Sequence, residues 1–246
     1  MLDFIKVVIL GIVEGITEWL PVSSTGHLIL VGSVLKPGLS DAFMEMFDVV
    51  IQLGAIMAVV VLYFHKLNPF SPRKSERQKM LTWQMWIKVA IASVPAAIVG
   101  LLFNDYLDAI FYKPVPVAIM LIVYGVLFII IEDKHRGKQP KVTRISQLTL
   151  KMLLWIGVFQ MLALIPGTSR SGATIVGALL IGVSRETAAE FTFFLAIPVM
   201  FGASLLKLLK FGFAFSAAEF GFLMLGCIVS FGVSIFAIKF LMGYIK

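Results

Sequence analysis

Two short polar segments interrupt long apolar stretches of this sequence, and both carry residues that could do chemistry. Glu14 and Glu18 precede the segment 21–27, which reads Pro-Val-Ser-Ser-Thr-Gly-His, and Arg170 lies in a second segment of similar character. Carboxylates, hydroxyls, imidazole and guanidinium are groups that proteins use to bind cations and phosphates. The two segments are therefore the candidate functional sites.

Glu14 and Glu18 are four residues apart, so on a helix they share one face. Ionised carboxylates inside a membrane segment are energetically unfavourable and usually functional, and two together repel each other unless a cation compensates them. A divalent cation with oxygen ligands, Mg²⁺ or Ca²⁺, suits such a pair. The alternative is that both acids form ordinary structural ion pairs, but their position beside a polar segment favours the metal site.

Ser24 is the candidate nucleophile of the first segment. His27 follows three residues later and could accept the hydroxyl proton. Ser23, Thr25 and Gly26 beside it are candidate substrate-binding residues. The alternative is that these residues and their neighbours only cap a helix that begins after Thr25. Both can hold together, because a helix N-terminus at this point would also favour a bound phosphate.

Arg170 is the candidate anion-binding residue of the second segment, because an arginine at membrane depth needs an anion. A helix is expected to begin at Ser171, so that its first amides point to the same place, and the combination predicts a phosphate cradle. The other candidate substrate-binding residues here are Thr168, Ser169, Ser171, Gly172 and Thr174. The alternative partner of Arg170 is Glu14 or Glu18, in a purely structural bridge.

Three further polar residues in apolar runs are expected to support the site. Asp48 and Gln52 are four residues apart and could line the same cavity, and Gln160 falls near the position that corresponds to Glu14 in a repeat described below.

The composition specifies the environment in which these residues act. The chain has 246 residues, of which 59% are apolar and only 14% are charged, and its mean hydropathy is +0.97. A soluble domain is about 25% charged, so the composition excludes a soluble enzyme and intrinsic disorder and predicts an all-α, polytopic membrane protein. The single Cys227 excludes an internal disulfide and a cysteine-based metal site.

Hydropathy divides the chain into spans and two broken segments. Apolar runs at 49–64, 89–104, 114–131, 191–206 and 220–238 predict transmembrane helices. Segments 5–35 and 152–182 are each broken in the middle, which predicts re-entrant helical hairpins with a polar loop at depth.

Charge and spacing predict the topology. Six Lys/Arg lie in 66–88 and six in 134–151, so both connectors are expected in the cytoplasm. Neither shows basic residues interleaved with stacking aromatic residues, the pattern of a nucleic-acid face. The first hairpin then enters from outside and the second from inside. Pro21 and Pro166 are 145 residues apart, which predicts one membrane domain built from inverted repeats, 1–145 and 146–246. On that symmetry the second repeat lacks a final helix.

The segments 14–27 and 166–174 strongly resemble the two signature motifs of the bacterial undecaprenyl-diphosphate phosphatase family, of the bacitracin-resistance type. The resemblance implies a multi-pass protein of the bacterial inner (plasma) membrane that hydrolyses a polyprenyl diphosphate, recycles the lipid carrier of peptidoglycan synthesis and depends on a divalent metal. It implies a metal or acid–base role for Glu14 and Glu18, attack by Ser24 with His27, and diphosphate binding by Arg170.

Alternatives to this function stay open. Inverted repeats with broken helices are also a transporter architecture, so a flippase for a polyprenyl phosphate is the rival. The sequence does not give the oligomeric state, and a homodimer is one assembly that it allows.

Overall fold

The computed structural model describes residues 2–135, 137–212 and 214–245, and these residues form helices with a single isolated bridge between Val142 and Val183. The elements in chain order are α1 (Leu2–Thr17), α2 (Ser24–Leu35), α3 (Asp41–Val50), α4 (Gln52–Leu62), α5 (Phe64–Leu67), α6 (Glu76–Phe111), α7 (Pro114–His135), η1 (Ile145–Gln147), α8 (Leu150–Met161), η2 (Leu162–Leu164), α9 (Arg170–Leu180), α10 (Arg185–Phe211) and α11 (Ala217–Ile245). The predicted all-α fold is confirmed.

The five predicted transmembrane segments are confirmed as helices long and apolar enough to cross a bilayer. They cover Asp41–Leu62, Glu76–Phe103, Pro114–His135, Arg185–Phe211 and Ala217–Ile245. Each helix extends past the apolar run that predicted it, because polar residues continue the helix beyond the hydrocarbon. Ser184, for example, caps α10 by accepting a hydrogen bond from the Thr187 backbone N–H, seven residues before the apolar run begins at Phe191.

Both broken segments form helical hairpins, α1–α2 and α8–α9, as predicted. The predicted starts of their second helices were late by one or two residues, because the caps are Ser23 and Ser169. The Ser23 side chain accepts from the Gly26 N–H at 3.3 Å, and the Ser169 side chain accepts from the Gly172 N–H at 3.1 Å.

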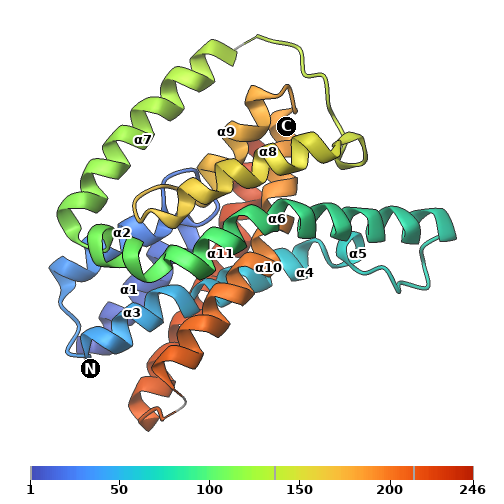
Figure 1. Cartoon of the computed structure of the whole chain (residues 1–246). Helices are drawn as coiled ribbons and strands as arrows, with labels where there is room; N and C mark the ends of the chain where they lie inside the picture. The colour runs from blue at the N-terminus through green and yellow to red at the C-terminus, as the bar shows by residue number, and fades with distance from the viewer. Residues whose placement is uncertain (1, 136, 213, 246) are drawn as a thin grey trace.

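The hairpins enter the molecule from opposite sides (Figure 1). The connector after α5, the connector between α7 and η1, and the end of α11 lie on one side, while the α2–α3, α6–α7 and α10–α11 connectors lie on the other. The two basic connectors are thus on the same side, as the positive-inside pattern requires.

The two halves pack in a similar way. Helix α1 packs against α2 and α11, and α11 also packs against α4. In the second half, α8 packs against α9 and α6, and α6 also packs against α10. Close approach requires glycine at the contact of α4 with α11, where a Cβ on Gly54 would lie 2.1 Å from the Cys227 carbonyl oxygen.

The protein interior lies around α4 and α10 and holds most of the large buried aromatic residues. Trp19 and Phe193 are fully buried, and their ring centroids lie 5.2 Å apart at an interplanar angle of 90°. By contrast, only 6% of the α7 span is buried, as expected for a helix that faces lipid. Most hydroxyl residues of the hairpin breaks, such as Ser24 and Thr168, are buried, and burial in protein is the condition for non-helical backbone at membrane depth.

Candidate functional site

The two hairpin breaks, which are far apart in the sequence, touch in the structure. The Ser171 hydroxyl lies 3.2 Å from the carbonyl oxygen of Glu18 and 3.1 Å from that of Leu20. Gly167 has a φ of +95° and a Cβ there would lie 2.7 Å from the Val117 carbonyl oxygen, so the second break requires glycine at this point. Residues from both breaks thus share one interior region.

Glu18 is the residue that joins the two hairpins chemically. Its Oε1 lies 2.5 Å from Arg170 Nη2, and its Oε2 accepts a hydrogen bond from the Ser24 hydroxyl. Arg170 also donates from Nη1 to the carbonyl oxygen of Thr192 at 3.3 Å. The Glu18 and Arg170 side chains are only 6% and 12% exposed, so water screens this pair weakly. An acid, a hydroxyl and a guanidinium are therefore held in one hydrogen-bonded group.

Glu14 lies one helical turn before Glu18 and is fully buried. Neither of its carboxylate oxygens has a hydrogen-bond partner in the part of the chain that the structure describes. The charged groups close enough to act on it are Glu18, Asp48 and Arg170. Asp48 accepts a hydrogen bond on Oδ2 from the Tyr112 hydroxyl at 3.2 Å, while its Oδ1 has no partner among the described residues.

These orphaned carboxylate oxygens fit a hard divalent cation. Buried polar atoms are nearly always satisfied, and three buried carboxylate oxygens, on Glu14 and Asp48, have no partner among the described residues, so they are free to coordinate a cation. The described residues contain no cluster of three or more His, Cys, Asp or Glu that could enclose a metal ion by itself. Mg²⁺ does not need one, because it usually keeps several waters and takes one or two carboxylates together with substrate phosphates.

His27 does not pair with Ser24 in this structure. Its Nδ1 lies 2.8 Å from the carbonyl oxygen of Ser23, and the Ser24 hydroxyl donates to Glu18 instead. Ser23 itself has a φ of +66°, a backbone conformation that residues other than glycine rarely adopt. Strained backbone of this kind clusters at functional sites. The proton acceptor in contact with the Ser24 hydroxyl is therefore Glu18 and not the predicted His27.

The hydroxyls of the second break mostly make contacts within the protein. Ser169 caps α9, Ser171 holds the first hairpin, and Thr174 bonds to the Arg170 carbonyl oxygen and to the Thr192 hydroxyl, both at 2.9 Å. Thr168 is buried and its hydroxyl has no partner among the described residues. On the second hairpin, the side-chain polar atoms without a partner among the described residues are therefore the Thr168 hydroxyl and the amide of Gln160, whereas Arg170 is paired with Glu18.

The remaining predicted residues lie around this group. Gln160 is buried, and neither end of its amide has a partner in the described part of the chain. Gln52 is half-buried and its amide nitrogen reaches the Asp48 carbonyl oxygen at 3.5 Å. Thr25 is half-buried, and Gly26 and Gly172 are close-contact positions: a Cβ on them would lie 3.2 Å from Gly167 Cα and 3.3 Å from Pro21 Cβ, respectively.

Two residues that hold side chains of the candidate site in place were not predicted from the sequence. Thr192 supplies the backbone oxygen that holds Arg170, and Tyr112 holds Asp48. Thr192 is a lone hydroxyl in a run of apolar and aromatic residues, which is a weak signal in the sequence. Tyr112 gives no signal in the sequence, because it lies outside the apolar runs, where a polar side chain is ordinary.

Comparison with known proteins places these residues in a family. The model of the family described as bacitracin resistance protein BacA matches residues 7–246. The undecaprenyl-diphosphatase of Acetivibrio thermocellus is 64% identical over 246 residues, which is 100% of this chain and 90% of that protein. The protein of the same name from Enterococcus faecalis is 63% identical over 244 residues, or 98% of this chain and 88% of the relative. The undecaprenyl-diphosphatase of Lactococcus lactis is 60% identical over 255 residues, which cover 100% of this chain and 90% of that protein.

Proposed function

Because this chain belongs to the family of the bacitracin resistance protein BacA, we propose that its two hairpin breaks form the active site of an undecaprenyl-diphosphatase. The reaction is hydrolysis of undecaprenyl diphosphate to undecaprenyl phosphate and inorganic phosphate, which recycles the lipid carrier of cell-wall synthesis and confers bacitracin resistance. The contact of Glu18 with both Arg170 and Ser24 is the observation that carries the proposal, because it joins an anion-binding group to a nucleophile.

Arg170 binds the diphosphate. Its guanidinium is rigid, always charged and nearly buried, and it suits phosphate oxygens as well as it suits the Glu18 carboxylate. Charge that develops on the transferred phosphoryl group is stabilised by the same positive charge, in surroundings that screen it weakly. The prenyl chain stays in the lipid while the headgroup enters between the hairpins.

Ser24 attacks the terminal phosphorus. As its oxygen forms the new P–O bond, the hydroxyl proton passes to Glu18 Oε2, which already accepts that hydrogen bond. The bond from this phosphorus to the bridging oxygen breaks, and undecaprenyl phosphate leaves. Water then hydrolyses the phosphoserine to inorganic phosphate and restores the hydroxyl. In the alternative route, water activated by Glu18 attacks directly and Ser24 only binds the phosphate.

Glu14 and Glu18 would hold the divalent metal, Mg²⁺ or Ca²⁺, with the free oxygen of Asp48 close by. When bound, the metal would neutralise diphosphate charge. The support for this assignment is that the carboxylate oxygens of Glu14 are buried and have no partner among the described residues. Gln160 and Thr168 offer further unpartnered oxygens from the second hairpin.

The protein acts in the bacterial inner (plasma) membrane as a multi-pass protein, which the five apolar helices support. The residues proposed for catalysis, Glu14, Glu18, Ser24 and Arg170, all come from a single chain. The proposal therefore needs no second protomer, even if the protein forms a homodimer, and no nucleic acid.

The rival function is transport of a polyprenyl phosphate, and the opposite entry of the two hairpins favours it (Figure 1). Phosphate release by the purified chain from undecaprenyl diphosphate, with added Mg²⁺ or with EDTA, separates the two. Release that EDTA abolishes supports the hydrolase. No release in Mg²⁺, together with movement of a labelled polyprenyl phosphate between the leaflets of a vesicle, would favour transport.

A further inference from the structure

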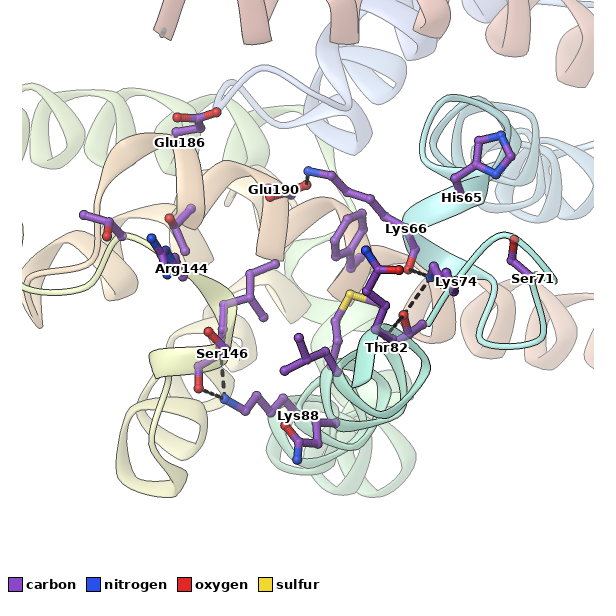
Figure 2. A pocket seen from close by; sticks show the side chains of 18 of the residues that line it. His65, Lys66, Ser71, Lys74, Thr82, Lys88, Arg144, Ser146, Glu186 and Glu190 are labelled. Carbon is purple, nitrogen blue, oxygen red and sulfur yellow. Dashed lines mark hydrogen bonds and ion pairs between the residues drawn. The ribbon is translucent and has the colours of Figure 1, made fainter. Parts of the chain in front are cut away.

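A cavity of about 840 Å³ lies at the ends of helices on the side of the two basic connectors (Figure 2). Its walls come from α5, the beginning of α6, the segment around η1 and the beginning of α10. None of the residues proposed for catalysis or metal binding lines it. The proposed hydrolase activity therefore gives this cavity no role.

The cavity is strongly basic. Five Lys or Arg side chains line it, against two Glu. Two of the lysines are held in place by the protein. Lys74 Nζ donates to the carbonyl oxygens of Lys66 and Asn68 and to the Thr82 hydroxyl, at 3.1, 2.9 and 2.7 Å, and partial desolvation lowers the pKa of Lys74. Lys88 Nζ donates to three carbonyl oxygens around η1, at 2.7 to 3.0 Å. The positive charge is thus fixed in position.

Much of this charge is not neutralised within the protein. Lys66 pairs with Glu190, but Arg73 and Arg144 are exposed and form no ion pair with any residue that the structure describes. Figure 2 shows Arg144 across the cavity from Lys74. Two guanidinium groups at the rim of a basic cavity are suited to bind the oxygens of a phosphate.

The position and the apolar lining favour a lipid as the source of that phosphate. The candidate membrane span of α6, Glu76–Phe103, is 28 residues long, or about 42 Å, against about 30 Å of hydrocarbon. Its first turns can therefore reach the headgroup region. Leu81, Met85 and Phe194 also line the cavity. Nearby, the exposed rings of Phe70 and Trp83 pack edge to face at 5.6 Å, as is typical of aromatic residues at a membrane interface.

We propose that this cavity binds the phosphate headgroup of an anionic phospholipid from the adjacent leaflet, through Arg73 and Arg144. Basic pockets between transmembrane helices on the cytoplasmic side of a membrane bind such headgroups, and the basic connectors beside this cavity are predicted to lie on that side. The phosphate is held by the guanidinium groups, and the upper part of the acyl chains lies against Leu81 and Met85. The site goes beyond the hydrolase reaction and takes a ligand that the enzyme does not turn over.

The test compares three forms of the full chain in detergent micelles. They are the wild type, the double variant R73Q/R144Q, and the matched control R77Q/K134Q, which removes the same charge from exposed positions that do not line the cavity. Native mass spectrometry measures the affinity of each form for phosphatidylglycerol. Phosphatidylcholine and inorganic phosphate serve as the parallel ligands, and thermal unfolding shows that all three forms are folded.

We expect the wild type and the control to bind phosphatidylglycerol alike, and R73Q/R144Q to bind it about 30-fold more weakly, from roughly 1 kcal/mol per basic residue. Equal weakening of the control would overturn the proposal, since general surface charge would then explain the binding. Equal wild-type binding of phosphatidylcholine would also overturn it, and competition by millimolar inorganic phosphate would show a site for the free ion instead. Because binding is measured and not hydrolysis, these outcomes do not depend on the proposed activity.

Discussion

The charges of Glu18 and Arg170 should be strongly coupled, so that removal of both together destabilises the protein no more than removal of either one alone. The nitrogen–oxygen distance of this ion pair is 2.5 Å and its side chains are 6% and 12% exposed. Removal of one partner of a buried pair leaves an uncompensated charge and destabilises a protein by about 3–5 kcal/mol. We therefore expect E18Q and R170Q each to lower the free energy of unfolding by about 3 kcal/mol.

The double variant E18Q/R170Q leaves neither charge unpaired, so its loss should be no larger than that of either single variant, at most about 3 kcal/mol, and not the sum of about 6 kcal/mol. The coupling energy from this double-mutant cycle is then at least about 3 kcal/mol. Thermal unfolding in one detergent gives the comparison, with activity measured in parallel and expected to be lost in all three variants. The exposed pair Lys79–Glu76, at 2.7 Å with side chains 32% and 88% exposed, is the matched control, and E76Q should cost less than about 1 kcal/mol. Additive losses at Glu18 and Arg170 would refute the reasoning.

Three other changes have definite expected outcomes. Ser24→Ala should lower kcat by about 100-fold or more if Ser24 is the nucleophile, and wild-type kcat with no trapped phosphoserine would establish direct attack by water. Glu14→Gln should raise the Mg²⁺ concentration needed for half-maximal phosphate release, because it removes a buried, unpartnered carboxylate, and an unchanged Mg²⁺ titration would remove Glu14 from the metal site. Gly54→Ala should destabilise the protein by about 1–3 kcal/mol through its clash with the Cys227 carbonyl oxygen. In contrast, Gly232→Ala, where a Cβ meets nothing within 4 Å, should be neutral or stabilising in the same thermal assay.

Much of the fold could be predicted because hydrophobic length and charge act locally. The apolar runs predicted the five spans, and the polar breaks predicted both hairpins. The helix starts at Ser24 and Arg170 were predicted less accurately, because several neighbouring hydroxyls could serve as the cap. The division into two inverted repeats and the cytoplasmic location of the basic connectors stay predictions, which the similar packing of α1 and α8 supports.

The sequence predicted which residues belong to the site better than it predicted which of them bond to one another. Glu18 and Arg170 were identified because charge at membrane depth is rare, but the choice between a phosphate and a carboxylate as the partner of Arg170 needed the tertiary structure. The Ser24 hydroxyl bonds to Glu18 and not to His27. Ser23 has a positive φ, and the His27 ring contacts the Ser23 carbonyl oxygen instead. Sequence spacing cannot give such a conformation. Thr192 contributes through its carbonyl oxygen, and a backbone atom leaves no signal in residue type.

The most direct test of a catalytic site built from both hairpins is the initial rate of phosphate release from undecaprenyl diphosphate. The wild type, E18Q from the first hairpin and R170Q from the second are assayed in Mg²⁺ in the same micelles, with R77Q as the surface control. We predict release by the wild type and the control, and a loss of at least about 100-fold in kcat/KM in each of the other two. Release near the wild-type rate by either E18Q or R170Q would contradict the assignment of the active site.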